Sequence, residues 1–178
     1  GKRDRLVRIL FSAFFALIAG LRVSDKWQDW LLFTNREDVG INDAQFDKDI
    51  GFYIFELPFF NFVVDWVFGT LLVTLIFTAI THYLKGGIRF QTLGERVRPQ
   101  VKAHLSVLLA AIALVRAANY WLARYELTTS DRGAVDGATY TDVKAQLPAT
   151  NLLILISLLA VILLVVNIRR RGWVLTTL

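Results

Sequence analysis

The chain contains no cysteine, and this absence removes several kinds of chemistry at once. Without a thiol, these 178 residues hold no disulfide, no thiolate metal ligand and no cysteine nucleophile. Methionine is also absent, even at position 1, and the stretch Leu6–Leu21 lacks the small-residue cleavage site of a secretory signal peptide. We therefore expect the chain to be an internal piece of a longer protein.

Recognisable catalytic patterns are missing as well. The sequence shows no Ser-His-Asp set, no paired catalytic carboxylates and no metal-ligand spacing. The glycines at Gly86-Gly87 lack the preceding strand and the Gly-Lys-Ser/Thr ending of a phosphate-binding loop, and are more typical of a helix end. The expectation is a protein that is not an enzyme and that uses no cofactor and no metal.

What the chain has in excess is apolar residues. Hydrophobic residues make up 55% of it, the mean hydropathy is +0.48 and there are 13 phenylalanines. A helix needs about 20 apolar residues to cross the hydrocarbon core of a bilayer. Four stretches approach that length, which predicts an all-α, polytopic transmembrane helical bundle in a single transmembrane domain, with spans at about residues 6–21, 59–84, 103–121 and 150–168. Arg8 lies inside the first stretch, so a helix lying on the membrane surface is the alternative there.

The positive charges alternate along the chain and predict its orientation. Lys and Arg concentrate before the first span, between residues 85 and 102, and after the fourth span. Because short loops rich in Lys and Arg stay in the cytoplasm, both ends and the loop 85–102 should be cytoplasmic, and the outer loops 22–57 and 122–148 should face outward. The net charge of +5 then matches anionic lipid headgroups, and no nucleic acid is expected.

The outer loops carry their own signals. Apolar residues recur at helical spacing through Asp43–Pro58, which predicts an amphipathic helix lying on the outer membrane surface. Thr141–Leu147 is expected to form a short helix that Thr141 caps and Pro148 ends. Four tryptophans should form an outer aromatic belt: Trp27, Trp30, Trp66 and Trp121.

Two ionisable residues fall inside the expected spans, Asp65 in the second and Arg116 in the third. Counted from the outer ends of these stretches, each lies about 9–10 Å deep at 1.5 Å per residue, so the two should meet. Since an unpaired charge in hydrocarbon is costly, we expect an intramembrane ion pair. It can act as a structural clamp between helices or as a proton or ion relay. An acid that an arginine neutralises has little reason to titrate near neutral pH, which favours the clamp.

The two histidines, His82 and His104, lie near the cytoplasmic ends of the second and third stretches. Paired helical histidines can hold a haem or a pigment. No Met, Cys or further His completes such a site in this sequence. Interfacial histidines that hydrogen bond to lipid headgroups or to backbone are the commoner case, and we expect that here.

Several segments in one order resemble uncharacterised protein family 0182, a family of large multi-span bacterial membrane proteins that is prominent in actinobacteria. They include Asp43-Ala-Gln-Phe-Asp-Lys-Asp-Ile-Gly-Phe-Tyr-Ile-Phe-Glu-Leu-Pro-Phe, His82-Tyr-Leu-Lys-Gly-Gly-Ile-Arg and Tyr120-Trp-Leu-Ala-Arg-Tyr. The resemblance implies a place in the inner part of the family's membrane domain, in a bacterial plasma membrane. It implies no catalytic residues, because the family has none established.

Two functions follow as hypotheses. The first is an integral membrane subunit that anchors or scaffolds a cell-envelope membrane assembly, with membrane lipids and other integral membrane proteins as its partners. The outward loops, rich in aromatic residues and carboxylates, favour it. The alternative is a component of a lipid or ion transporter or channel, with Asp65 and Arg116 in the path.

Overall fold

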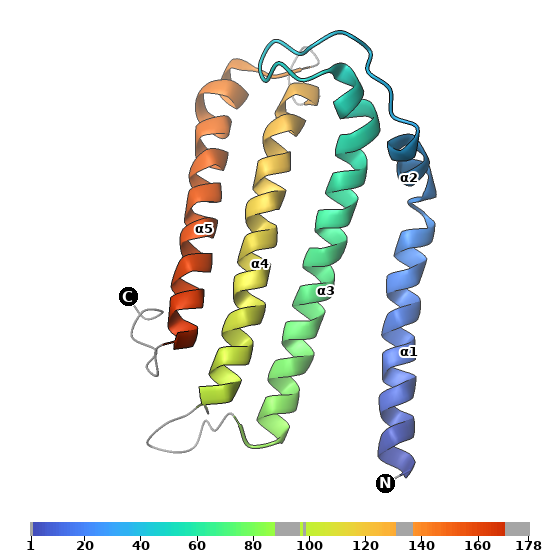
Figure 1. Ribbon diagram of the computed structural model, residues 1–178, viewed down its shortest axis with the longest axis vertical. Coiled ribbons are helices and arrows are strands. Elements are labelled where there is room, and N and C mark those ends of the chain that lie inside the picture. Colours follow the sequence, from blue (N-terminus) through green and yellow to red (C-terminus); the bar gives the residue numbers. More distant parts are fainter. Residues whose placement is uncertain (1, 88–96, 98, 131–136, 170–178) are drawn as a thin grey trace. The chain divides into compact units, whose positions relative to one another are not determined.

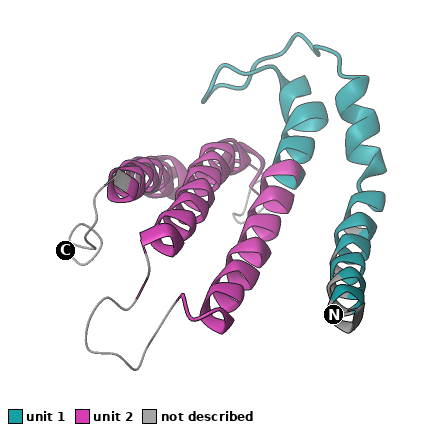
Figure 2. Ribbon diagram, turned by 60° about the horizontal axis from the view of Figure 1, so that its bottom comes forward, with its two compact units in different colours: residues 1–62 teal, residues 63–178 magenta. Residues whose placement is uncertain are grey.

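A computed structural model describes residues 2–87, 97, 99–130 and 137–169, and it divides into two compact units, Gly1–Phe62 and Val63–Leu178, which are described separately below (Figure 2). The described part of the chain is all-α, with an isolated bridge between Asn42 and Asp49. Its α-helices are α1 (Lys2–Ser24), α2 (Trp27–Thr34), α3 (Leu57–Leu84), α4 (Pro99–Glu126) and α5 (Leu147–Arg169) (Figure 1). Shorter turns of other helix types are the π-helical η1 (Phe52–Glu56) and η3 (Asp142–Gln146) and the 3-10 turn η2 (Leu127–Thr129).

Three helical runs are long and apolar enough to cross a membrane: Phe52–Leu84, Pro99–Thr129 and Asp142–Ile168. They contain the second, third and fourth stretches expected from the sequence, and this confirms a membrane protein. The first stretch lies in α1, where the apolar part Ser12–Leu21 is shorter than a span needs. Its assignment as a fourth span stays a prediction.

Unit 1 contains α1, α2, the following loop and the beginning of α3. A cluster of aromatic rings joins the short helix α2 to the first turn of α3. Phe33 stacks on Phe59 at 4.6 Å between ring centroids, and Trp30 meets the same ring edge-on at 5.4 Å. Phe60 packs edge-on against Phe33 at 5.5 Å. These contacts bury apolar ring surface within this unit and hold α2 beside the start of the span.

Two of the spans begin in the same way. In each, a five-residue π-turn is followed by Leu-Pro-x-x-Asn, at Leu57–Asn61 and again at Leu147–Asn151. The leucine N–H reaches back five residues, to the carbonyl of Phe52 in the first case and of Asp142 in the second. A proline cannot donate the next helical hydrogen bond, and the wider π-turn just before it allows the helix to continue.

The end of α3 follows from glycine. Gly86 has a φ of +66°, in the left-handed region that glycine adopts without strain. Its N–H donates to the carbonyl of Tyr83, and the N–H of Gly87 donates to the carbonyl of His82. This is the hydrogen-bond pattern of a glycine helix cap, and it confirms that Gly86-Gly87 ends the helix.

In unit 2, α4 and α5 pack along each other (Figure 1). The buried positions of α4 include small residues, Ser106, Ala110 and Ala117, which allow two helix backbones to approach closely. At one level of this interface the fully buried Asn167 of α5 donates to the hydroxyl of Ser106 at 3.4 Å. The opposite faces are apolar and exposed, as lipid-facing helices are, through Val107, Leu114 and Trp121 on α4 and Leu152, Leu155, Leu159 and Ile162 on α5.

Two expectations for the outer loops are wrong. Residues 43–49 form turns, and the helix begins only at Ile50 and runs through η1 into α3. Carboxylates cause this difference, because Asp43 accepts a hydrogen bond from the N–H of Phe46 and Asp49 accepts one from the N–H of Gly51, groups that a helix over 43–58 would use itself.

The expected short helix at 141–147 is part of the continuous run Asp142–Ile168, and Pro148 does not end it. Thr139 occupies the cap, since Asp142 accepts from both its N–H and its hydroxyl. Most of the expected cytoplasmic loop, residues 88–96 and 98, lies outside the described residues.

Candidate functional site

The polar network around Asp65 is the candidate site. Asp65 lies on α3 and its side chain is exposed. One carboxylate oxygen, Oδ1, accepts a hydrogen bond from the side-chain amide of Asn119 on α4 at 3.1 Å. The candidate span is Phe52–Leu84, so Asp65 lies near its middle, about 20 Å from Phe52 at 1.5 Å per residue.

Arg116 is held mainly by its own helix. Its Nη1 donates to Oδ1 of Asn119 at 3.3 Å, and its Nη2 donates to the hydroxyl of Tyr120 at 3.1 Å. The guanidinium also lies over two rings, 4.8 Å from the centroid of Tyr120 and 5.2 Å from that of Phe68 on α3. These cation–π contacts strengthen when water is excluded, as it is between membrane helices.

The structure thus brings Asp65 and Arg116 into one network with Asn119 between them. Among the ion pairs of the described residues, none joins the two directly. Asn119 presents its N–H to the anion and its oxygen to the cation, and this orientation of the amide is the one that serves both neighbours. In place of a direct pair, the structure shows a bridged arrangement in which the Asn119 amide hydrogen bonds to both side chains.

Sequence reasoning missed Asn119, Tyr120 and Phe68. The signal was present, since Asn119 and Tyr120 follow Arg116 by three and four residues and so share its helix face. Phe68 stands three residues after Asp65 and faces α4 by the same rule. An arginine inside a span should prompt a search of these positions for partners.

The two histidines also meet. His82 Nε2 and His104 Nδ1 are 3.2 Å apart, with the rings perpendicular and their centroids 5.5 Å apart. A centroid separation this large for so short an N···N distance means that the two nitrogens point straight at each other, as in an N–H···N hydrogen bond. A metal ion needs two ligand nitrogens that converge on it at about 2.0–2.1 Å each. No group of three or more metal-binding side chains occurs in the described part of the chain.

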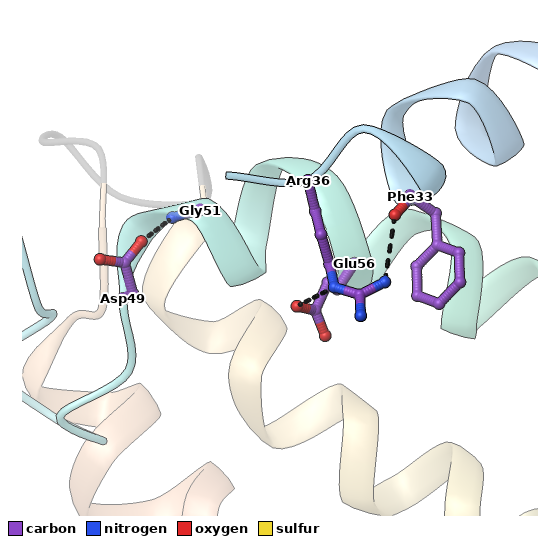
Figure 3. A network of polar contacts seen from close by, with 5 residues as sticks. All are labelled: Phe33, Arg36, Asp49, Gly51 and Glu56. Carbon is purple, nitrogen blue, oxygen red and sulfur yellow. Dashed lines mark hydrogen bonds and ion pairs between the residues drawn. The ribbon is translucent and has the colours of Figure 1, made fainter. Parts of the chain in front are cut away.

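The loop of unit 1 is organised by carboxylates (Figure 3). Asp49 accepts hydrogen bonds from the N–H groups of Val39 at 3.0 Å, Gly40 at 2.7 Å and Gly51 at 2.6 Å. Arg36 forms an ion pair with Glu56, with Nε 3.6 Å from the carboxylate. Its Nη1 donates to the carbonyl of Phe33 at 3.4 Å. The loop therefore has a defined shape without secondary structure of its own.

Asp43 organises the middle of the same loop. It accepts from the N–H groups of Gln45, Phe46 and Lys48 and from the Tyr53 hydroxyl at 2.7 Å. Burial alone would raise the pKa of Asp43, but these four hydrogen bonds together lower the pKa below its ordinary value. Hydrogen bonds from the N–H groups of Val39 and Gly51 are the main reason that the pKa of Asp49 is also lowered.

The whole chain, residues 1–178, matches the family described as Uncharacterised protein family (UPF0182). The chain belongs to this family. A UPF0182 protein of Frankia alni is 47% identical over 174 residues, which are 98% of this chain and 17% of the relative. One from Frankia casuarinae is 46% identical over 97% of this chain and 17% of the relative, and one from Streptomyces coelicolor is 38% identical over 91% and 17%.

The UPF0182 segment thus spans about 17% of the length of the curated relatives it matches. No solved structure matches it. The resemblance expected from the sequence is confirmed, and so is the occurrence of homologues in actinobacteria. The family description gives no activity.

The amide of Asn119 should be the member of the network that the others depend on. Asn119→Leu removes the hydrogen bond to Asp65 and one of the bonds to Arg116, and should lower stability by about 1–3 kcal/mol because polar groups between the two helices lose their partners. The measurement is thermal unfolding of the full-length protein in mild detergent. Ala118→Leu, at the exposed neighbouring position, is the matched control. Equal melting temperatures for the two variants would contradict this role.

The carboxylate loop should respond to acid. The charged forms of Asp43 and Asp49 bind the backbone, so their lowered pKa values stabilise the loop above the unfolded-state pKa of about 3.9, and this contribution is lost as the pH falls through the lower folded-state values. Amide exchange of the loop, corrected for its intrinsic pH dependence, should show protection that persists to about pH 4 and disappears below.

Two variants sharpen the pH measurement. Asp49→Ala should remove the protection already at neutral pH, since the N–H groups of Val39, Gly40 and Gly51 lose their acceptor. Asp38→Asn, in the same loop, should leave the profile unchanged. Protection that survives in Asp49→Ala would show that the carboxylate does not hold the loop.

Proposed function

We propose that this segment is part of an integral subunit of the bacterial plasma membrane that anchors or scaffolds a cell-envelope assembly and has no catalytic centre of its own. The carrying observation is the apolar surface that the spans leave uncovered. In the apolar window of Phe52–Leu84 no residue is buried within the chain, and in that of Asp142–Ile168 only 6% of them are. Such surface needs lipid or other membrane helices around it.

The polar network supports a structural role. Its hydrogen bonds join α3 to α4 near the middle of two spans, where they fix the register of the helices. Thr70 and Thr74 of α3 donate their hydroxyl protons to carbonyls of their own helix, at 2.9 Å and 2.8 Å. Hydroxyls satisfied in this way suit packed helices better than a water-lined path.

The orientation in the membrane belongs to the same proposal. The Lys and Arg distribution favours cytoplasmic ends for the segment and a cytoplasmic connection between α3 and α4. The carboxylate loop and the aromatic cluster of unit 1 would then face outward, where they could contact partner proteins and lipid headgroups. Tryptophans near that end, such as Trp27 and Trp121, suit the interface.

Cysteine labelling tests this orientation. The segment has no native cysteine, so Thr34→Cys and Lys85→Cys can be made in a full-length protein from which any other cysteine has been removed. An impermeant maleimide added to intact cells should label Thr34→Cys and should label Lys85→Cys only after the cells are opened. The reverse pattern would invert the topology.

A second candidate is a lipid or ion transporter component. The observation that favours it is the position of Asp65, whose exposed carboxylate lies near the middle of a span and accepts one neutral hydrogen bond. Ionisable residues at such depth often mark transport routes. In this reading Asp65 exchanges a proton or ion, and Arg116 sets its electrostatic surroundings.

Paired neutral substitutions separate the two functions. Asp65→Asn with Arg116→Gln keeps hydrogen-bonding groups near Asn119 and removes both charges. If the network is a clamp, the double variant should recover the full-length protein's partners in a mild-detergent pulldown at the wild-type level. Recovery of the protein alone, from wild type as well as variant, would count against the scaffold. Intact assembly with loss of ion or lipid flux in reconstituted vesicles would favour the transporter.

A further inference from the structure

The face of α3 that carries Asp65 is incomplete in this segment. Asp65, Gly69, Leu72 and Ile76 follow each other at intervals of four, three and four residues, so they share one side of the helix. Leu72 is 41% exposed and Ile76 is 50% exposed. A side chain built on Gly69 would meet nothing within 4 Å. The space beside this glycine would allow another helix backbone to approach closely.

The charge of Asp65 indicates which kind of side chain a helix packed on this face should bring. In the part of the chain that the structure describes, Oδ1 has Asn119 as its partner and no donor reaches Oδ2. The nearest cation of the network, Arg116, is engaged by Asn119, Tyr120 and two rings. An ionised aspartate within a span is costly when nothing compensates its charge. A second donor, and above all a cationic one, would remove much of that cost.

We propose that the Asp65 face of α3 is the docking site for another membrane-spanning helix of the same full-length polypeptide, one that brings a lysine or arginine to the depth of Asp65. We assign the helix to the same polypeptide because this segment spans only 17% of the length of its relative, so most of the full-length protein lies outside it. We assign a lysine or arginine to that helix because Oδ2 of Asp65 has no donor among the described residues. The inference deepens the proposed scaffold by naming the surface on which it assembles.

Site-specific photocross-linking tests the docking site in the full-length protein in its native membrane. The photoreactive residue p-benzoylphenylalanine is placed at Leu72, on the Asp65 face, or at Thr74, on the opposite side of the same helix. Leu72 should cross-link to a membrane segment outside residues 1–178 of the same polypeptide that contains a Lys or Arg. Thr74 should not give that product. Ile76, on the same face, replaces Leu72 if that variant is not stably inserted.

The role of the charge is tested in the same experiment. Asp65→Asn should lower the yield of the Leu72 cross-link about fivefold or more, the factor for a lost contact of about 1 kcal/mol, whereas Asp65→Glu should retain most of it. Cross-links only to lipid, only to α1 or only to a separate protein would overturn the proposal. A separate protein as the sole product would still support a scaffold, so the two proposals can fail independently.

Discussion

A polar group inside a bilayer has no water to bind, and this constraint shapes the long helices of the UPF0182 segment. The backbone meets it with long helices, of which three are long and apolar enough to cross. Polar side chains meet it by bonding to one another across helices, as Asn119 does with Asp65. Residues 43–49, which lie before the first of these runs, form no helix, and there the Asp43 carboxylate accepts backbone N–H groups. Within the helices, the sequence thus supplies the partner that the bilayer does not.

The same constraint explains how two of the spans tolerate proline. Pro58 and Pro148 both lie at the second position of their α-helices, after a π-turn. The π-turn moves one hydrogen bond to the fifth residue back, so the helix passes the missing proline donor without a break. Trp30-Leu31 and Trp121-Leu122 stand at nearly the same distance upstream of the two Leu-Pro pairs. The segments that lead into these two spans thus share local sequence motifs, and a hydropathy profile alone does not reveal this similarity.

Patterns that depend on composition were predictable from the sequence. Apolar length identified three spans, and Gly86-Gly87 identified a helix end, because hydropathy and glycine geometry act locally. The spacing of apolar residues wrongly predicted a helix at Asp43, because that pattern takes no account of competing hydrogen bonds. The competing effect is the capture of backbone N–H groups by aspartate, which depends on three-dimensional turns that spacing does not encode.

The charged pair shows the same limit at the candidate site. The structure brings Asp65 and Arg116 into one network, and sequence spacing could not show that Asn119 lies between them. The two charged groups have unequal numbers of contacts. Arg116 gains hydrogen bonds and two ring faces from within the segment, whereas Asp65 gains a single neutral bond. The cation thus has two hydrogen bonds and two ring contacts and the anion has one hydrogen bond, and this difference is why we place the docking site on the Asp65 side of α3.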